Sequence, residues 1–228
     1  MSAQQTAMLD ALAVDPIRQA PLFHALSSVP RAWIATKESP HVHHVDEHAG
    51  GMLAPRLCAD LLLWLDVERD SSFLNVQSGA GYVNALVAVM QNWTGVNCGS
   101  ESDAALVEHA QQRVDVFARN SGVGAANRVA FEKEAIDGAS FDRVLVSAIC
   151  PSVTFVQERF MSLLKTDGVL VAPCMRDDGS GTAVAFVRFA KSDVGITTEM
   201  RIVSAKSDGS RLEISISEKN WSANWASF

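Results

Sequence analysis

Two glycines and an acid have the types and spacing of a nucleotide-cofactor site. The stretch FLNVQSGAGY, residues 73–82, places Gly79 and Gly81 between an apolar run and a helical pattern that starts near Tyr82. Such a turn lets the backbone approach a cofactor while the first amides of the helix point at it. Glu101 ends the next apolar run, where its carboxylate could accept hydrogen bonds from both ribose hydroxyls. The pattern predicts a site for a dinucleotide or for S-adenosylmethionine (AdoMet), although the full glycine pattern has Gly where Gln77 stands.

Other side chains could also do chemistry. Arg56, at the start of a helical pattern, could bind an acidic group through two hydrogen bonds, but an exposed Arg there is also ordinary. Ser147 follows an apolar strand, where it either contacts substrate or bonds to the backbone. One concentration of metal-ligand types has no supporting cysteine, and its histidines are not set in a helical H-x-x-x-H frame, so we expect no metal site there: His41, His43, His44, Asp46, Glu47 and His48.

Strand and helix patterns alternate through the middle of the chain, from Phe73 to Pro173. FLNV precedes YVNALVAVMQNW, TGVNCG precedes SDAALVEHAQQRVDVFARN, and FDRVLVSA precedes VTFVQERFMSLLK. RVAFEKE adds a strand, and GVLVAP follows an expected turn at Lys165 to Gly168. Ser102 and Asp103 suit the start of a helix, and Asn120 to Gly122 its end. The alternation predicts an α/β fold, a mostly parallel twisted sheet with helices on both faces.

Both ends of the chain depart from this alternation. The last third contains TAVAFVRFA, ITTEMRIVSAKS and RLEISISEK, whose alternating apolar and polar positions predict antiparallel C-terminal strands. The beginning is expected to hold one or two helices, at Gln4 to Ala13 and Ile17 to Ser27, and then the histidine-rich stretch. We expect a single domain over residues 1–228, with 1–50 as an N-terminal helical and loop segment. Three aromatic residues either pack on this domain or bind a partner: Trp221, Trp225 and Phe228.

Composition limits the possible functions. The chain has 228 residues, of which 48% are hydrophobic, so it can bury one sizeable core. A net charge of −7 without a dense basic run argues against binding to nucleic acid or to an anionic membrane. No apolar run approaches the roughly 20 residues that span a bilayer, and the first residues lack the pattern of a secretory signal. Widely spaced cysteines in apolar segments favour a reducing compartment, and we expect the cytoplasm: Cys58, Cys98, Cys150 and Cys174.

Several segments together resemble the protein-L-isoaspartate O-methyltransferase family, AdoMet-dependent enzymes that methylate the carboxylate of isoaspartyl residues. LNVQSGAGYVNALVA is similar to the first AdoMet motif of that family, and VNCGSESDAALVEHA to the second. FDRVLVSAICPSV and LLKTDGVLVAPC resemble its fourth and fifth strands, and VPRAWI and AGGMLAPRLCADLL the segment ahead of the glycine loop. The likeness covers about residues 29–174. It implies a Rossmann-like methyltransferase fold, AdoMet as cofactor, and a peptide or protein carboxylate as substrate.

The resemblance also implies roles for single residues. Glu101 would hold the ribose, Glu134 would lie beside the adenine, and Ser147 near the reacting methyl group. Leu53 and Arg56 occupy the places of a serine and a histidine in the family, and with Ser147 they are the catalytic candidates. The implied cofactor-binding residues are, in chain order, Gln77, Ser78, Gly79, Gly81, Glu101, Glu134 and Ser147.

Some positions depart from the family pattern. Asn75 stands in the place of an acid that helps to anchor the ammonium group of the cofactor, Gln77 replaces the first glycine, and Lys133 replaces the glycine of a Gly-Asp pair. With Leu53, these differences favour two alternatives. One is a methyltransferase-fold protein with weak or lost catalysis that acts as a binding or assembly component, and the other is a methyltransferase for another carboxylate. A nicotinamide dehydrogenase would share only the glycine loop and Glu101.

Overall fold

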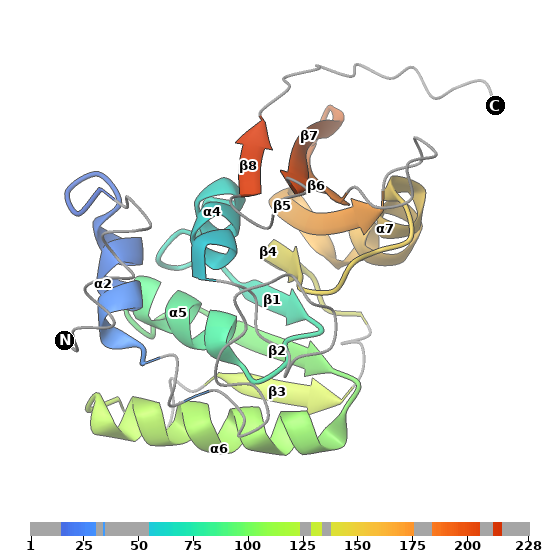
Figure 1. Ribbon diagram of the computed structural model, residues 1–228. Helices are drawn as coiled ribbons and strands as arrows, with labels where there is room; N and C mark the ends of the chain where they lie inside the picture. Colours follow the sequence, from blue (N-terminus) through green and yellow to red (C-terminus); the bar gives the residue numbers. More distant parts are fainter. Residues whose placement is uncertain are drawn as a thin grey trace, which may run out of the picture.

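A computed structural model describes residues 15–30, 34, 55–123, 129–133, 138–175, 184–205 and 212–215. In these ranges the strands form one eight-stranded sheet with the order β3-β2-β1-β4-β5-β6-β7-β8 (Figure 1). The strands are β1 Phe73–Val76, β2 Asn97–Glu101, β3 Ala130–Lys133, β4 Phe141–Val146, β5 Leu164–Met175, β6 Val184–Ser192, β7 Gly195–Ala205 and β8 Leu212–Ser215. The helices are α2 Ala20–Ser28, α4 Pro55–Leu65, α5 Tyr82–Met90, α6 Ala104–Asn120, α7 Val153–Phe160 and the 3₁₀ helix η2 Met161–Leu163.

The direction of the strands agrees with the prediction from the sequence. Strands β1 to β5 pair in parallel, and β6, β7 and β8 extend the sheet as antiparallel strands. The first strand lies in the middle of the parallel part because the chain adds β2 and β3 on one side and then crosses back to add β4 and β5 on the other. The α/β fold with an antiparallel ending is therefore confirmed.

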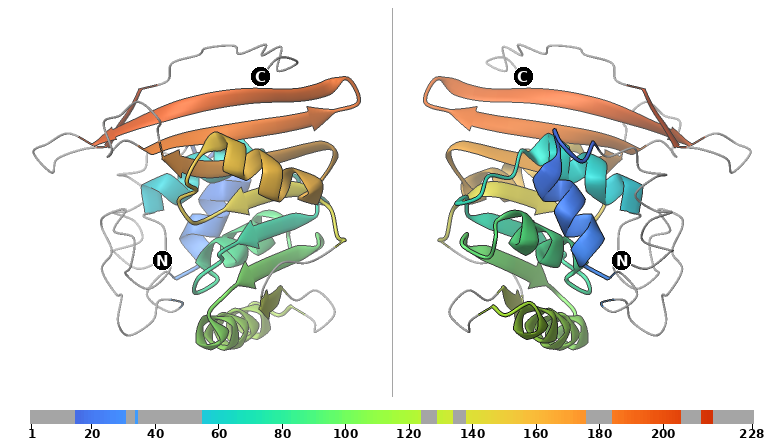
Figure 2. Two further views of the ribbon diagram at one scale, coloured as in Figure 1. Left: turned by 90° about the vertical axis from the view of Figure 1, so that its right-hand side faces the viewer. Right: turned by 90° about the vertical axis from the view of Figure 1, so that its left-hand side faces the viewer.

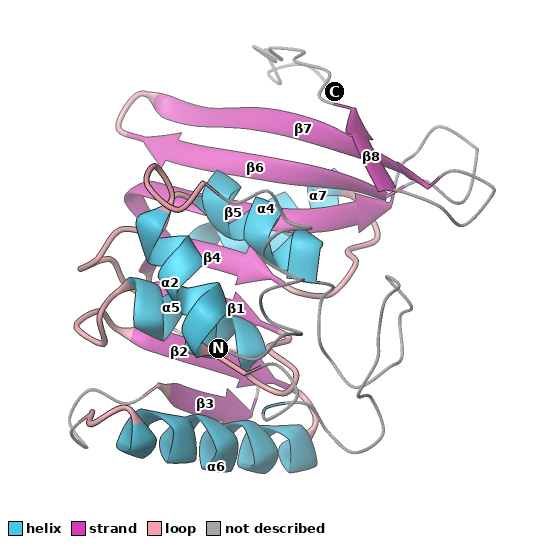
Figure 3. Cartoon of the chain, turned by 60° about the vertical axis from the view of Figure 1, so that its left-hand side comes forward, coloured by secondary structure: helices cyan, strands magenta, loops and turns pink. Residues whose placement is uncertain are grey.

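Two hydrophobic cores lie on the two faces of the sheet. Helices α2, α4, α5 and α6 cover one face, and α7 with η2 covers the other, as the opposite views of Figure 2 and the side view of Figure 3 show. In β1 the side chains alternate between the two cores: Phe73 packs under α5, and Leu74 belongs to the core beneath α7. This alternation is the reason why successive positions of β1, such as 73 and 74, are both apolar.

Local capping sets the starts of two helices. Asp103 caps α6 by accepting a hydrogen bond of 2.8 Å from the amide of Ala105, and Ser152 caps α7 by accepting one of 3.0 Å from Phe155. The helix expected at Ile17 to Ser27 is α2, which starts three residues later at Ala20. The other N-terminal helix, the histidine-rich stretch and the C-terminal aromatic residues lie outside the described residues. No helix in the described ranges is long and apolar enough to cross a membrane.

The turn expected at Lys165 to Gly168 is an irregularity inside β5, so that prediction was wrong in its boundary. Strand β5 already pairs with β4 at Leu164, and the pairing then jumps from Phe141↔Leu164 to Arg143↔Val169. Asp167 has a φ of 62°, a left-handed conformation that lets the extra residues loop out while the strand continues. The turn-forming residues therefore make a bulge.

A polar cluster joins three elements at the amino edge of the sheet. The carboxylate of Asp142 on β4 accepts hydrogen bonds of 2.7 Å from the amide and 2.6 Å from the hydroxyl of Ser72, and it pairs with Lys165 at 3.0 Å. Partial burial raises the pKa of Asp142, but the bonds from Ser72 and the Lys165 ammonium outweigh that effect and lower it to about 2. The charged form of Asp142 therefore stabilises the fold.

We expect Asp142→Asn to lower the free energy of unfolding by about 1 to 2 kcal/mol at pH 7, because a neutral amide loses the ion pair and one acceptor. A folded-state pKa below the ordinary value means that the contribution is complete above about pH 4 and is lost as the pH falls toward 2. Chemical denaturation between pH 7 and pH 2 should show the two proteins converging in stability. Asp193→Asn, at an exposed turn, is the control, and an equal effect of both substitutions would contradict the assignment.

Candidate functional site

The carboxyl ends of β1, β2 and β4 meet at one edge of the sheet, and the glycine loop lies there. The order β2-β1-β4 reverses the direction in which strands are added at β1. Such a switch point leaves a crevice outside the carboxyl ends of the strands, which is the usual ligand site of open α/β sheets. The chain turns through residues 77–81 at this place and enters α5 at Tyr82. The fold therefore places the predicted loop where a ligand would bind.

Three residues of the loop have a left-handed backbone. The φ angles are 56° at Gln77, 55° at Gly79 and 83° at Gly81. At Gly81 a Cβ atom would lie 2.7 Å from the ring of Phe131, so a side chain has no room there. The side chain of Gln77 is exposed, and its amide oxygen accepts a hydrogen bond of 3.3 Å from Ser102. Gln77 thus adopts a conformation that favours glycine while its side chain extends out of the loop.

Glu101 is buried, with 5% of its surface exposed, and its carboxylate organises the loop. Oε2 accepts a hydrogen bond of 2.8 Å from the amide of Gly79, and Oε1 accepts bonds of 2.8 Å and 3.2 Å from the amides of Ser102 and Asp103. These amides compensate the cost of burying the charge. The carboxylate therefore joins the glycine loop to the start of α6, a structural role that the sequence pattern did not show.

Three buried asparagines connect β1, α5 and β2. The Nδ2 of Asn75 donates to Oδ1 of Asn84 at 3.0 Å, and the Nδ2 of Asn84 donates to Oδ1 of Asn97 at 2.8 Å. The hydroxyl of Ser147, which follows β4, donates to Oδ1 of Asn75 at 2.6 Å. We call Asn97, Asn84 and Asn75 the amide chain. It reaches the edge of the sheet at the point where β1 and β4 separate.

The segment after β4 is held from both sides by backbone hydrogen bonds. The amide of Ser147 donates to Val76 at the end of β1 at 2.8 Å, and the amide of Cys150 donates to Pro173 on β5 at 2.8 Å.

The hydrogen bond between the thiols of Cys174 and Cys150 and the burial of Cys174 both raise the pKa of Cys174. A protonated, buried Cys174 is not a nucleophile at neutral pH, which agrees with the sequence expectation of cysteines as small hydrophobic residues.

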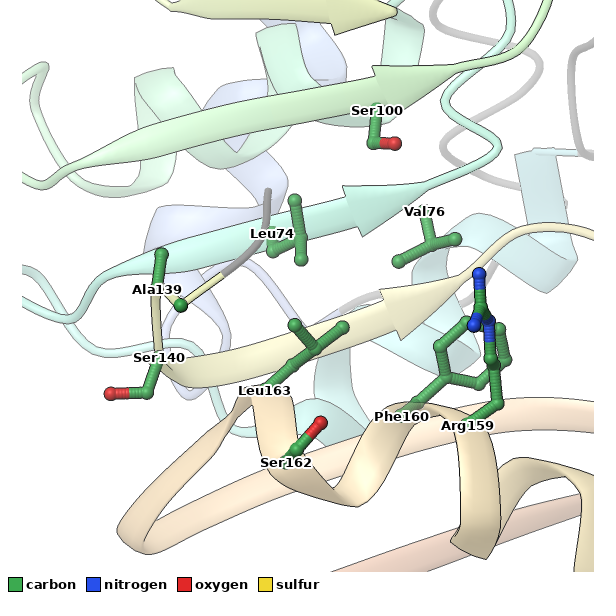
Figure 4. A pocket seen from close by; sticks show the side chains of 10 residues that line it. Leu74, Val76, Ser100, Ala139, Ser140, Arg159, Phe160, Ser162 and Leu163 are labelled. Atoms are coloured by element: carbon green, nitrogen blue, oxygen red, sulfur yellow. The ribbon is translucent and has the colours of Figure 1, made fainter. Parts of the chain in front are cut away.

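A cavity of about 400 Å³ lies on the α7 face of the sheet. Figure 4 shows Leu74 and Val76 of β1, Ser100 of β2 and Arg159 and Phe160 of α7 around it. Val76 and Ser100 directly precede the glycine loop and Glu101 in sequence. The cavity also reaches Gly138, Ala139 and Ser140 ahead of β4, and none of the residues predicted as site residues lines it.

The structure brings six of the predicted site residues to one edge of the sheet: Gln77, Ser78, Gly79, Gly81, Glu101 and Ser147. Arg56 lies in the first turn of α4, but its side chain is not described. Leu53 and Glu134 lie outside the described residues. No group of three or more potential metal ligands occurs in the described part of the chain. The assigned roles of these residues remain predictions.

Sequence reasoning missed Asn84 and Asn97. Both stand in strongly apolar segments, YVNALVAVM and VNCG, and are 0% and 5% exposed. A polar side chain buried in such a segment needs hydrogen-bond partners, and a third asparagine, Asn75, stands inside FLNV. Three asparagines in three adjoining apolar elements were the available signal of a polar network inside the fold.

Comparison with known families gives one match that covers most of the chain. The model of the family described as protein-L-isoaspartate(D-aspartate) O-methyltransferase (PCMT) matches residues 3–205. This range contains the glycine loop, Glu101, the amide chain and Ser147.

Solved structures with the same fold include two described as protein-L-isoaspartate O-methyltransferases. One, from Plasmodium falciparum in complex with S-adenosyl-L-homocysteine (AdoHcy), has a TM-score of 0.67 and 17% identity, and the match covers 90% of this chain and 97% of that one. The other has a TM-score of 0.66 and 17% identity, and the match covers 90% of this chain and 64% of that one. At this identity the likeness shows the fold.

We expect Gln77→Gly to raise the free energy of unfolding by about 0.5 to 1 kcal/mol. Relief of the left-handed backbone outweighs the extra entropy of glycine in the unfolded chain. Gln77→Ala is the control, because it keeps the strain and removes only the exposed side chain. Equal stability of the two variants in urea denaturation would contradict this reading. If the Gln77 side chain also crowds a cofactor, calorimetric titration should show tighter AdoHcy binding to both variants.

We expect Glu101→Gln to weaken AdoHcy binding by about 2 to 4 kcal/mol, since the ligand loses charge-assisted hydrogen bonds and the loop loses its anchor. The stability should fall as well, because an NH₂ group would then face a backbone amide. Glu132→Gln, an exposed carboxylate on β3, is the control. Calorimetric titration at a temperature where the variant is folded measures the effect, and unchanged affinity would remove Glu101 from the cofactor site.

Proposed function

Because the chain belongs to the protein-L-isoaspartate(D-aspartate) O-methyltransferase family, we propose that it transfers a methyl group from AdoMet to the free carboxylate of an isoaspartyl residue in a peptide or protein. The observation that carries this proposal is the family match over residues 3–205, which includes every element of the carboxyl edge described above. The enzyme is thus an AdoMet-dependent methyltransferase, and the isoaspartyl carboxylate is the acceptor that its family indicates.

The residues at the carboxyl edge fit AdoMet. Gly81 at the N-cap of α5 makes no side-chain cap hydrogen bond, and the positive end of the helix dipole favours a ligand carboxylate there. Glu101 presents a buried carboxylate on β2, and each of its oxygens has more than one lone pair, so Oε2 can accept from a ribose hydroxyl in addition to Gly79. Ser147 follows β4 on the other side of β1, where the methionine part of AdoMet would extend.

Catalysis in this reaction depends on orientation. AdoMet supplies an electrophilic methyl group on a positively charged sulfur. The attacking carboxylate is already ionised at neutral pH because carboxyl groups titrate near 4, so the chain need not supply a general base. The glycine loop and Glu101 would fix the cofactor, and the segment after β4, held by Val76 and Pro173, would fix one wall of the acceptor site. Arg56 and Leu53, ahead of the loop, are proposed to face the acceptor.

A role in protein repair and a location in the cytoplasm belong to the same proposal. None of the four cysteines forms a disulfide bond, which suits a reducing compartment: Cys58, Cys98, Cys150 and Cys174.

We expect slow transfer of a labelled methyl group to an isoaspartyl peptide and none to the matching aspartyl peptide. A cofactor or acceptor that is misplaced by the altered positions can lower the rate by about a hundredfold without any missing chemical group. Leu53→Ser combined with Gln77→Gly should therefore raise the rate.

Three other results would change the proposal. Binding of AdoMet without transfer to either peptide would indicate another acceptor. Equal labelling of both peptides would show that the site does not recognise the isoaspartyl linkage. Failure to bind AdoMet at millimolar concentration would favour a binding or assembly component with lost catalysis.

A further inference from the structure

The amide chain has a direction, and backbone carbonyls fix it. The Nδ2 of Asn97 donates to the main-chain oxygen of Asn84 at 2.9 Å, and the Nδ2 of Asn84 donates to the main-chain oxygen of Cys98 at 2.9 Å. A carbonyl oxygen only accepts hydrogen bonds, so both amide groups must point their NH₂ toward these carbonyls. The orientation of Asn97 and Asn84 is therefore set by the fold.

The remaining orientations follow step by step. With its NH₂ committed, Asn84 can offer only Oδ1 to Asn75, so Asn75 must donate through Nδ2 at 3.0 Å. Asn75 then has only Oδ1 left for Ser147, 2.6 Å away. An amide oxygen cannot donate, so the proton of this short bond comes from the hydroxyl of Ser147. Asn75 and Asn84 are both 0% exposed, so water does not compete for these groups.

Ser147 is consequently an acceptor toward the crevice. Its single hydroxyl proton points at Asn75, and only the lone pairs of Oγ remain for a ligand. A group that donates hydrogen bonds is favoured at this position. A carboxylate or phosphate oxygen is disfavoured, because it would bring two acceptors together.

The position of Ser147 relative to Glu101 indicates which part of the ligand would lie beside the Ser147 hydroxyl. Ser147 follows β4 and Glu101 ends β2, and β1 with its glycine loop lies between them. If the ribose of AdoMet binds at Glu101, as proposed above, the methionine part extends across the loop toward β4. That part ends in a carboxylate and an ammonium group, and of these two only the ammonium donates hydrogen bonds.

We propose that the amide chain holds the hydroxyl of Ser147 as a fixed acceptor, and that this hydroxyl binds the ammonium group of AdoMet. The inference rests on the proposed function, because it assumes that AdoMet is the ligand. It makes Ser147 a binding residue for the cofactor, and Asn75, Asn84 and Asn97 positioning residues. The uncharged amide chain and Ser147 would then anchor the ammonium group, which is the role of a carboxylate at position 75 in the family pattern.

The test compares AdoHcy with its des-amino analogue, in which hydrogen replaces the amino group, by calorimetric titration of the full chain. The native protein should bind the analogue at least tenfold more weakly. Equal affinity for the two ligands would overturn the inference and leave the methyltransferase proposal intact. Failure to bind AdoHcy or AdoMet at all would overturn both, so the two outcomes are distinguishable.

Variants of Ser147 test whether its hydroxyl causes the difference in affinity between AdoHcy and the des-amino analogue. Ser147→Ala should weaken AdoHcy binding about tenfold and leave binding of the analogue unchanged, and Ser147→Thr should restore the preference because it keeps the hydroxyl. Ser162→Ala, an exposed serine on η2, is the matched control and should bind both ligands as the native protein does. A Ser147→Ala protein that retains the full preference would place the ammonium group elsewhere.

A second variant tests the direction of the chain. Asn84→Asp replaces the NH₂ that faces Asn97 and Cys98 with an oxygen, so it should lower the melting temperature by several degrees and reduce the discrimination between the two ligands. A purely structural network would lose stability alone. Full discrimination in folded Asn84→Asp protein would show that the amide chain does not position Ser147.

Discussion

The carboxyl edge of the sheet depends on one buried anion, the carboxylate of Glu101. A buried charge is costly unless it is paired or hydrogen-bonded, and here backbone amides supply the compensation. One of these amides belongs to Gly79, so the Glu101 carboxylate on β2 helps to fix the course of the loop that follows β1. The loop in turn determines where α5 begins. The acid that the sequence assigns to a ligand is therefore first a part of the scaffold.

On the other side of β1, the buried polar side chains are uncharged amides. Asn75 occupies the centre of the switch point with no exposed surface, and a carboxylate there would need a donor from α5. Asn84 offers Oδ1 instead, because its NH₂ is bound to Asn97 and Cys98. An acid at position 75 would thus require a different residue at 84. A change at 84 would in turn remove the hydrogen-bond donor to Asn97, so position 97 would have to change as well. The departure from the family pattern is a property of three positions together.

The sequence predicted the elements better than it predicted the contacts. Apolar periodicity located α6 and α7, and Asp103 marked the start of α6, since these signals are local in the chain. The amide partners of Glu101 and the amide chain could not be read, because they depend on the direction of side chains from different strands. The bulge at Asp167 was missed for a related reason: its residues are typical of turns, and only the pairing of Leu164 and Val169 with β4 on either side shows that the strand continues through them.

The antiparallel strands are also connected with the site. At the carboxyl end of α4, the main-chain oxygen of Trp64 accepts a bond of 3.0 Å from Arg188 on β6, and the indole donates to Glu199 on β7 at 3.3 Å. Arg201 stacks on the same ring, with its guanidinium carbon 4.2 Å from the ring centroid. These contacts fix one end of the helix that carries Arg56 at its other end. The antiparallel strands therefore help to hold α4 on the face of the sheet that α5 also covers.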